Sequence, residues 1–95
     1  MSTYNEVWEK IHYVGRELRE KRTKLTLRQL AVWLDTEGIT APSTGKPYRP
    51  GGRGIASAVA MAYRQVESAF GKDEANESIA AVFTDAGGRY AYDNY

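Results

Sequence analysis

The feature that most constrains the fold of this 95-residue chain is a stretch rich in proline and glycine near its middle. All three prolines, Pro42, Pro47 and Pro50, lie in this stretch, and three glycines accompany them between residues 39 and 52. Proline lacks a backbone N–H and fixes φ, so no helix continues through such a run. The stretch 39–52 therefore predicts a loop of consecutive turns with helical segments on either side. A loop this long in a small domain is uncommon and tends to be functional or mobile.

The length and composition favour one small helical domain over residues 1–95. A chain of this size buries only about two-thirds of the surface that its unfolded form exposes, so a second independent core is excluded. Aliphatic residues are few, but the net charge is only +1, and disorder requires a larger one. We expect a core of helix contacts through small residues, filled by aromatic rings, because the chain has twelve alanines, seven tyrosines and two tryptophans.

Apolar residues recur at spacings of three and four in four segments, which predicts an all-α fold of about four helices. The segments are about 4–22, a shorter one between Thr26 and Gly38, about 53–70 and about 73–86. Thr3 with Glu6, and Thr26 with Gln29, form capping-box patterns. The residues expected on the buried faces are Tyr4, Val7, Trp8, Ile11, Val14 and Leu18; Leu27, Leu30, Ala31 and Leu34; Ile55, Ala58, Val59, Ala62, Val66, Ala69 and Phe70; and Ala75, Ile79, Val82, Phe83 and Ala86.

Two features mark the C-terminal part of the chain. Asp73 is the expected N-cap of the last helix, with Gly87 past its end. Residues 87–95 alternate aromatic with small or polar side chains, which fits either an extended arm laid on a partner or a frayed end.

Charge is divided unevenly along the chain. Residues 1–72 hold twelve Lys or Arg and seven Asp or Glu, whereas residues 73–95 hold one Arg and five acids. Between Pro42 and Gln65 there are four basic residues and no acid, so a polyanion is attracted most strongly there. The acidic end fits a partner-binding arm, a tail that shields the basic part, or a soluble helix.

The third helical segment carries a second face, opposite its expected core. Arg53, Ser57, Ala60 and Arg64 share this face, which has small and basic side chains and no carboxylate until Glu67 at its edge. Such a face can approach another surface closely. The alternative is an alanine-rich helix that tolerates small exposed residues.

The sequence lacks the parts of most catalytic and metal sites. There is no cysteine, and His12 is the only histidine, expected on the exposed side of the first helix. No apolar run approaches the ~20 residues that span a bilayer, and the N-terminus does not resemble a signal peptide. We therefore expect a cytoplasmic protein that is not an enzyme, does not associate with membranes, and has no cofactor and no metal.

The run Leu27–Ile39, followed by Pro42, Gly45-Lys46 and Tyr48, resembles the helix-turn-helix module of serine recombinases and resolvases. It is also similar to the N-terminal DNA-binding domain of KfrA-type plasmid regulators. The resemblance covers about residues 25–66 and implies a helix-turn-helix core with the long Pro/Gly loop before the recognition helix. The recombinase catalytic domain is absent, and residues 49–52 lengthen the join to the recognition helix. The DNA-binding residues it implies are Arg53, Ser57, Ala60 and Arg64 in the groove, and Arg28, Lys46 and Arg49 on phosphates.

These patterns lead to two hypotheses of function. The first is a small sequence-specific DNA-binding protein, a transcriptional or maintenance regulator of a plasmid, phage or other mobile element, that binds double-stranded DNA as a homodimer. Its dimer interface is expected on the aromatic first helix or over residues 83–95. The second is a protein-binding module, such as a mobile-element inhibitor of a host protein, with the acidic C-terminal third and its tyrosines as the contact surface. An architectural DNA-bending factor is a further alternative.

Overall fold

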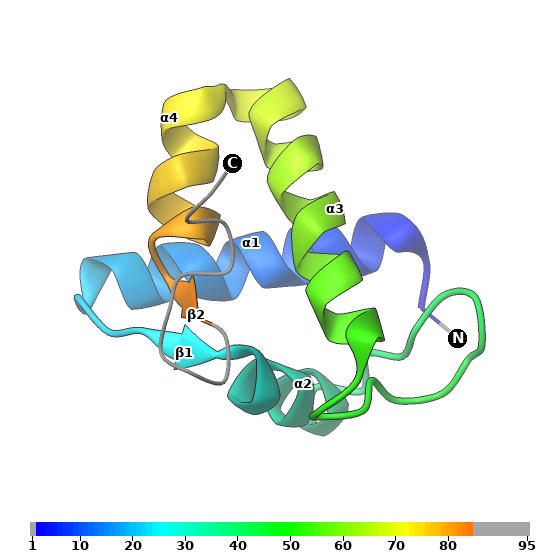
Figure 1. Cartoon of the computed structure of the whole chain (residues 1–95). Helices are drawn as coiled ribbons and strands as arrows, with labels where there is room; N and C mark the ends of the chain where they lie inside the picture. Colours follow the sequence, from blue (N-terminus) through cyan, green and yellow to red (C-terminus); the bar gives the residue numbers. More distant parts are fainter. Residues whose placement is uncertain (1, 85–95) are drawn as a thin grey trace.

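The computed structural model of the chain describes residues 2–84, and these residues form a mostly helical fold (Figure 1). The elements in chain order are α1 (Tyr4–Glu20), β1 (Leu25–Thr26), α2 (Leu27–Thr36), α3 (Arg53–Phe70), α4 (Lys72–Ala75), the π-helical turn η1 (Asn76–Ala80) and β2 (Phe83–Thr84). The expected all-α class with about four helices is confirmed. No helix in this part of the chain is long and apolar enough to cross a membrane.

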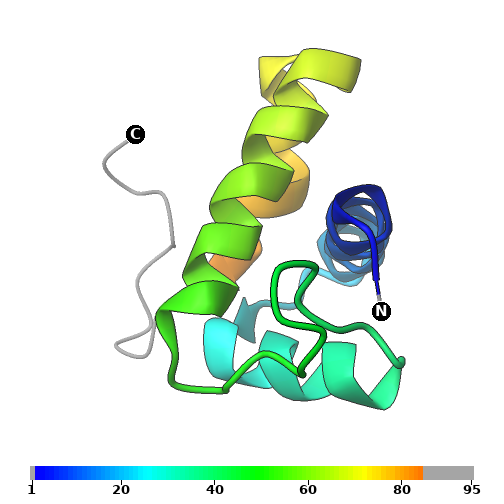
Figure 2. The same ribbon diagram turned by 90° about the vertical axis from the view of Figure 1, so that its right-hand side faces the viewer.

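The helices are arranged around one hydrophobic core. Helix α2 lies along the base, α3 stands across it, and α1 passes behind α3 and α4 (Figures 1 and 2). Helix α1 packs on both α3 and η1, whereas α2 packs on α3 and the two short strands. The loop between α2 and α3 folds back beside the start of α1, as both views show.

The helix ends follow the capping patterns of the sequence. The hydroxyl of Thr3 accepts a hydrogen bond from the backbone N–H of Glu6, and Thr26 with Gln29 forms a complete capping box. After α2, Gly38 has a φ of 75°, its N–H bonds to the carbonyl of Asp35, and the next N–H bonds to that of Leu34. This pair of bonds around a left-handed glycine is a Schellman motif, so the prediction that Gly38 ends α2 is confirmed.

Most of the expected core residues are buried, Trp8, Leu18 and Leu27 are half-buried against the core, and three are exposed. Tyr4 and Phe70 are 59% and 60% exposed, and Ala69 is also exposed. The chain reverses at Gly71, so the last turn of α3 lies at the free end of the α3–α4 pair. Tyr63 is buried on α3 instead, and its hydroxyl donates to the side-chain oxygen of Asn76.

The prediction of one continuous helix over 73–86 is wrong. The helix begins after Gly71 rather than at an Asp73 cap, passes into the π-helical turn, and ends at Ala80. Val82 and Phe83 are buried as expected, but not in a helix: Val82 lies in the turn after η1, and Phe83 begins β2, which pairs with β1 in parallel. The N–H of Leu25 donates to the carbonyl of Val82 (3.0 Å). Residues 85–95, which include the expected core residue Ala86 and the arm 87–95, lie outside the described residues.

The contact between α1 and η1 depends on a glycine. A Cβ atom built on Gly15 would lie 2.0 Å from the carbonyl oxygen of Ser78 and 3.4 Å from the ring of Phe83. Ser78 is fully buried, and its hydroxyl donates to the backbone carbonyl of Glu74 (2.7 Å). Only glycine allows the two backbones to approach this closely.

We predict that Gly15→Ala lowers the free energy of unfolding by about 1–3 kcal/mol, because the new methyl group meets a backbone atom that cannot rotate away. This loss occurs although Ala is favoured over Gly in a helix interior by about 1 kcal/mol. Urea denaturation of the two proteins measures it. Gly54→Ala is the matched control, since its Cβ would make only ordinary contacts with the Tyr48 ring, at 3.4 and 3.8 Å. Equal stability of Gly15→Ala and the parent chain would contradict the close contact.

The expectation that His12 lies on the surface is wrong. Its side chain is buried, and Nε2 lies 2.7 Å from Oε2 of Glu74. The other carboxylate oxygen of Glu74 accepts a hydrogen bond from Arg19 (2.8 Å), and the ring of Phe70 lies 5.1 Å from that of His12. The polar side of α1 is thus covered where α3 meets α4. The sequence of α1 alone does not predict this contact.

This environment lowers the pKa of the Glu74 carboxyl. Burial alone would raise its pKa, but the hydrogen bonds from His12 and Arg19, with the positive charge of Arg19, outweigh burial and hold the pKa below its usual 4.5. Because an ionised carboxylate only accepts hydrogen bonds, Nε2 of His12 is the donor. The ionised form of Glu74 therefore stabilises the fold.

We predict that the free energy of unfolding falls as the pH drops through the folded-state pKa of Glu74. The sign follows from the lowered pKa: the stabilisation is fully present above pH 4.5 and is lost below it. Glu74→Gln should remove about 1–3 kcal/mol at neutral pH and flatten this part of the pH profile. Urea denaturation between pH 3 and pH 7 tests both effects, with the exposed Asp73→Asn as control. An unchanged slope in Glu74→Gln would refute the assignment.

Candidate nucleic-acid interface

The loop between α2 and α3 is built from hydrogen-bonded turns. The N–H of Gly45 donates to the carbonyl of Ala41 (2.8 Å), and the N–H of Ala41 donates to the carbonyl of Lys46 (2.8 Å). Gly45 has a φ of 70°, which suits glycine and allows the chain to reverse there. A second turn is closed by a bond from Gly52 to Arg49 (3.0 Å) just before α3.

Two anchors hold this loop against the helices. Near its start, the backbone N–H groups of Ser2 and Thr40 each donate to the other residue's hydroxyl, at 3.0 and 2.9 Å. Near its end, Tyr48 is buried with its ring beside Gly54, whose added Cβ would lie 3.4 Å from Cδ1 of the ring. Burial, with a smaller contribution from Tyr4, raises the pKa of Tyr48 above its usual 10. The loop is therefore tied to the start of α1 and the first turn of α3.

Helix α3 begins at this anchored end without a side-chain cap. Gly52 occupies the N-cap position, and no side chain accepts a hydrogen bond from the first turn. Free N–H groups at a helix start carry partial positive charge and favour anions. Arg53 is the first helical residue, so a positively charged side chain lies beside these groups.

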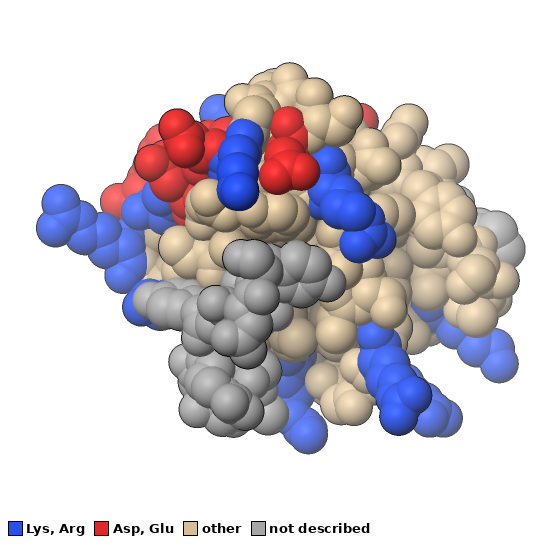
Figure 3. All heavy atoms as spheres, turned by 45° about the horizontal axis from the view of Figure 1, so that its top comes forward, with Lys and Arg blue, Asp and Glu red and all other residues tan. Residues whose placement is uncertain are grey.

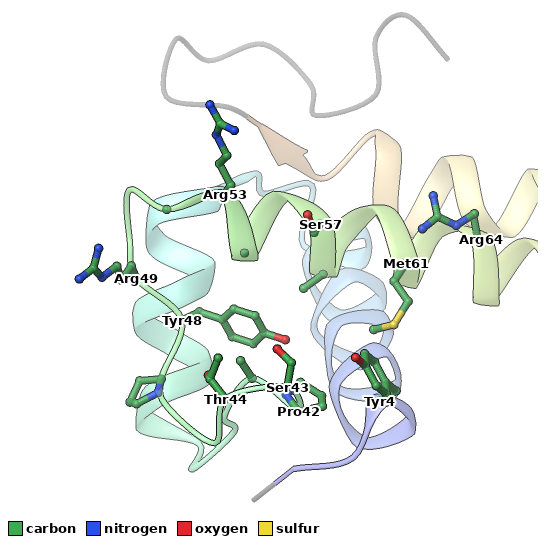
Figure 4. Close-up of a pocket in the computed structure, with 15 residues that line it drawn as sticks. Tyr4, Pro42, Ser43, Thr44, Tyr48, Arg49, Arg53, Ser57, Met61 and Arg64 are labelled. Atoms are coloured by element: carbon green, nitrogen blue, oxygen red, sulfur yellow. The ribbon is translucent and has the colours of Figure 1, made fainter.

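The loop, α3 and the start of α1 enclose a hollow of about 680 Å³. Three arginines line it, Arg49, Arg53 and Arg64, and no Asp or Glu does. In Figure 4, the Tyr48 ring points into the hollow beside Ser43 and Thr44, Tyr4 and Met61 lie at its other end, and Arg49 and Arg53 extend outward from its rim. The hollow thus combines hydroxyl groups and apolar surface with a basic rim.

The structure brings four of the seven sequence-predicted residues together here, since Ser57 lines the hollow with the three arginines. Ala60 does not line it and packs, half-buried, against the core. Lys46 is exposed on the loop outside the lining. Arg28 lies on the far side of the second turn, where a Cβ on Gly51 would be 3.3 Å from its Nη2.

The basic residues of this edge are not neutralised by neighbouring acids. Within residues 2–84, none of Arg28, Lys46, Arg49, Arg53 and Arg64 forms an ion pair. In Figure 3 the acidic side chains gather in the upper part of the molecule, whereas the basic side chains along the lower edge have no acid beside them. A polyanion approaching this edge meets positive charge without competition.

Tyr4, Ser43 and Thr44 line the hollow, although the sequence did not indicate them as DNA-binding residues. The sequence places Tyr4 on the apolar face of the first helix, and only the fold shows that its side chain is exposed beside the loop. Ser43 and Thr44 lay within a loop singled out as functional, but loop composition does not indicate which side chains converge.

The surface expected to bind a protein partner is only partly described. Asp73 and Glu77 are exposed, whereas Glu74 is turned toward His12 and Arg19. Residues 85–95, with the three tyrosines of the proposed contact surface, lie outside the described part of the chain. On the first helix, one of the two places where the dimer interface is expected, Tyr4 is exposed and Trp8 is half-buried.

Comparisons with known proteins give no family for this chain. No protein-family model, curated protein or solved structure matches it.

We predict that Tyr48→Ala releases the loop and lowers the free energy of unfolding by about 3 kcal/mol, since a buried aromatic ring is lost. Hydrogen exchange should then accelerate at the amides of Ala41 and Gly45, which form the loop turns. The control is Tyr13→Ala, which removes a tyrosine that is 56% exposed and should change neither quantity. Retained protection at Gly45 in Tyr48→Ala would mean that the ring does not anchor the loop.

Proposed function

We propose that the protein binds double-stranded DNA sequence-specifically through the start of α3 and the loop before it. The observation that carries this proposal is the hollow whose rim holds three arginines and whose lining holds no carboxylate. It lies beside a helix start that has no side-chain cap. The resemblance of residues 25–66 to helix-turn-helix modules also favours DNA binding at the start of α3.

The chemistry of the edge suits the two kinds of contact that DNA requires. The major groove of DNA admits one α-helix, and arginine reads guanine through two hydrogen bonds to its edge. Arg53 and Arg64, with Ser57 between them on α3, would make such contacts. Arg28, Lys46 and Arg49 would contact phosphates, which position the protein but do not read sequence.

A single domain of this size contacts too little DNA for strong specificity, so we propose that two copies bind a palindromic site. Small DNA-binding proteins of this kind act as transcriptional regulators, and we propose such a role on a plasmid, phage or other mobile element. This assignment rests on the helix-turn-helix resemblance alone.

Selection of bound fragments from random duplexes at near-physiological salt tests the proposal. Sequencing should recover a palindrome with half-sites about one helical turn apart. Recovery of no motif, with binding at low salt that vanishes as salt rises, would leave only non-specific electrostatics. That outcome would favour the protein-binding alternative, with the acidic C-terminal third as its contact surface.

We predict that Arg53→Ala and Arg64→Ala each weaken binding to the selected site by about 1–3 kcal/mol and relax preference at one base pair. Lys46→Ala should instead weaken binding to all sequences and reduce the salt dependence, because a phosphate contact carries no sequence information. Fluorescence anisotropy with labelled duplexes at several salt concentrations measures both effects. Arg16→Ala is the matched control, since Arg16 is exposed on α1 and lines a different hollow. Equal losses for Arg16→Ala and Arg53→Ala would refute the assignment of this edge.

A further inference from the structure

The hollow beside the start of α3 contains a tyrosine hydroxyl that no group of residues 2–84 satisfies. Tyr48 lines the hollow and is only 9% exposed, yet its hydroxyl forms no hydrogen bond within these residues. No fully enclosed side-chain nitrogen or oxygen in this part of the chain lacks a partner, so the hydroxyl must be accessible from the hollow. Figure 4 shows the ring pointing into this space. Because buried polar groups are normally paired, an unpaired hydroxyl here indicates a place for a polar atom of a ligand.

The Tyr48 hydroxyl is a hydrogen-bond donor at neutral pH. Burial raises the pKa of Tyr48 above its usual 10, so the phenol keeps its proton. A protonated phenol donates one hydrogen bond, and the strongest acceptors for it are the oxygens of a carboxylate or a phosphate. The hydroxyl therefore favours an anionic group in the hollow.

The start of α3, which borders the hollow beside Tyr48, favours an anion as well. The ring lies against the first turn of α3, where a Cβ atom on Gly54 would be 3.4 Å from it. Gly52 and Gly54 line the hollow here, and no side chain caps this helix start. Arg49 and Arg53 stand at the rim and form no ion pair within residues 2–84. Free N–H groups and arginines both attract an anionic group, and no carboxylate in the lining repels it.

The other end of the hollow offers apolar surface. Tyr4, Pro42 and Met61 line it there, and Figure 4 places Tyr4 and Met61 side by side. A tyrosine ring and a methionine sulfur both make favourable contacts with the face or edge of an aromatic ring. The volume of about 680 Å³ lies within the range of about 300–1,000 Å³ that is typical of small-molecule sites. Such sites combine an apolar wall with a few polar groups, as this hollow does.

We propose that this hollow binds a small molecule that has a flat aromatic body and one anionic group, a carboxylate or a phosphate. The anionic group accepts a hydrogen bond from the Tyr48 hydroxyl beside the start of α3, with Arg53 at the rim. The aromatic body packs against Tyr4 and Met61.

A bound anion would also regulate the basic edge. Arg49 and Arg53 line the hollow, and both are proposed to contact DNA. The small molecule and DNA therefore compete for the same positive charges, so the ligand acts as an effector that releases DNA. This regulatory consequence rests on the proposed DNA binding, but the binding of the small molecule does not.

Titration of the ¹⁵N-labelled full-length chain, followed by amide chemical shifts, tests the proposal. The probes are naphthoate and naphthyl phosphate, with naphthamide as the matched probe that keeps the ring and lacks the charge. We expect at least one of the anions to shift the amides of Gly52, Gly54 and Ser57 saturably. The expected dissociation constant is about 1 mM or tighter, as is usual for ligands of about 13 non-hydrogen atoms. Naphthamide should bind about tenfold more weakly, because it lacks the charge-assisted hydrogen bonds. No saturable shift with either anion, or equal affinity for naphthamide, would overturn the proposal.

Two variants with matched controls locate the site. Tyr48→Phe keeps the buried ring and removes only the hydroxyl, and it should weaken binding of the anion about fivefold. Tyr13→Phe makes the same change at an exposed tyrosine outside the hollow and should leave the affinity unchanged. Arg53→Gln should weaken binding about tenfold, whereas Arg16→Gln, at a residue that lines a different hollow, should not. Unchanged affinity in Tyr48→Phe or in Arg53→Gln would overturn the proposal.

The two proposals can fail separately. The shifts are measured without DNA, so they report binding of the anion whether or not the protein binds a duplex. Absence of these shifts leaves the selection of DNA fragments unaffected. Where both hold, the anion should release the selected duplex in fluorescence anisotropy, and naphthamide at the same concentration should not.

Discussion

The close approach of α1 to η1 at Gly15 is the constraint on which the other contacts depend. It allows the carbonyl of Ser78 to lie where a side chain would otherwise be. The chain after α3 can then return across α1, which brings Glu74 to His12 and Arg19. The same return places Val82 and Phe83 beside β1, so that the small parallel sheet forms at the start of α2. A side chain at residue 15 would therefore disturb the packing of η1 on α1, between Glu74 and the small sheet.

The basic edge is organised by the loop rather than by α3 alone. Tyr48 packs on the first turn of α3, and the Ser2–Thr40 pair fixes the other end of the loop to the N-terminus. This brings Arg49 beside arginines from two positions on α3. Charge alone would not make such an edge selective, because exposed arginines attract any polyanion. Selectivity requires fixed positions, and the two anchors fix the loop that carries Arg49 and borders Arg53.

Local chemistry made much of this fold predictable. Capping boxes and apolar spacing gave the start of α1 and α2, and the bounds of α3 agree with the expected 53–70. The errors are non-local. His12 is buried because it contacts Glu74, which lies 62 residues away in the sequence. Phe83 lies in a strand and not in the expected helix, because it pairs with Leu25 of β1. Tyr4 reached the hollow because the loop folds back onto α1. In each case the deciding contact joins segments far apart in sequence, which periodicity does not describe.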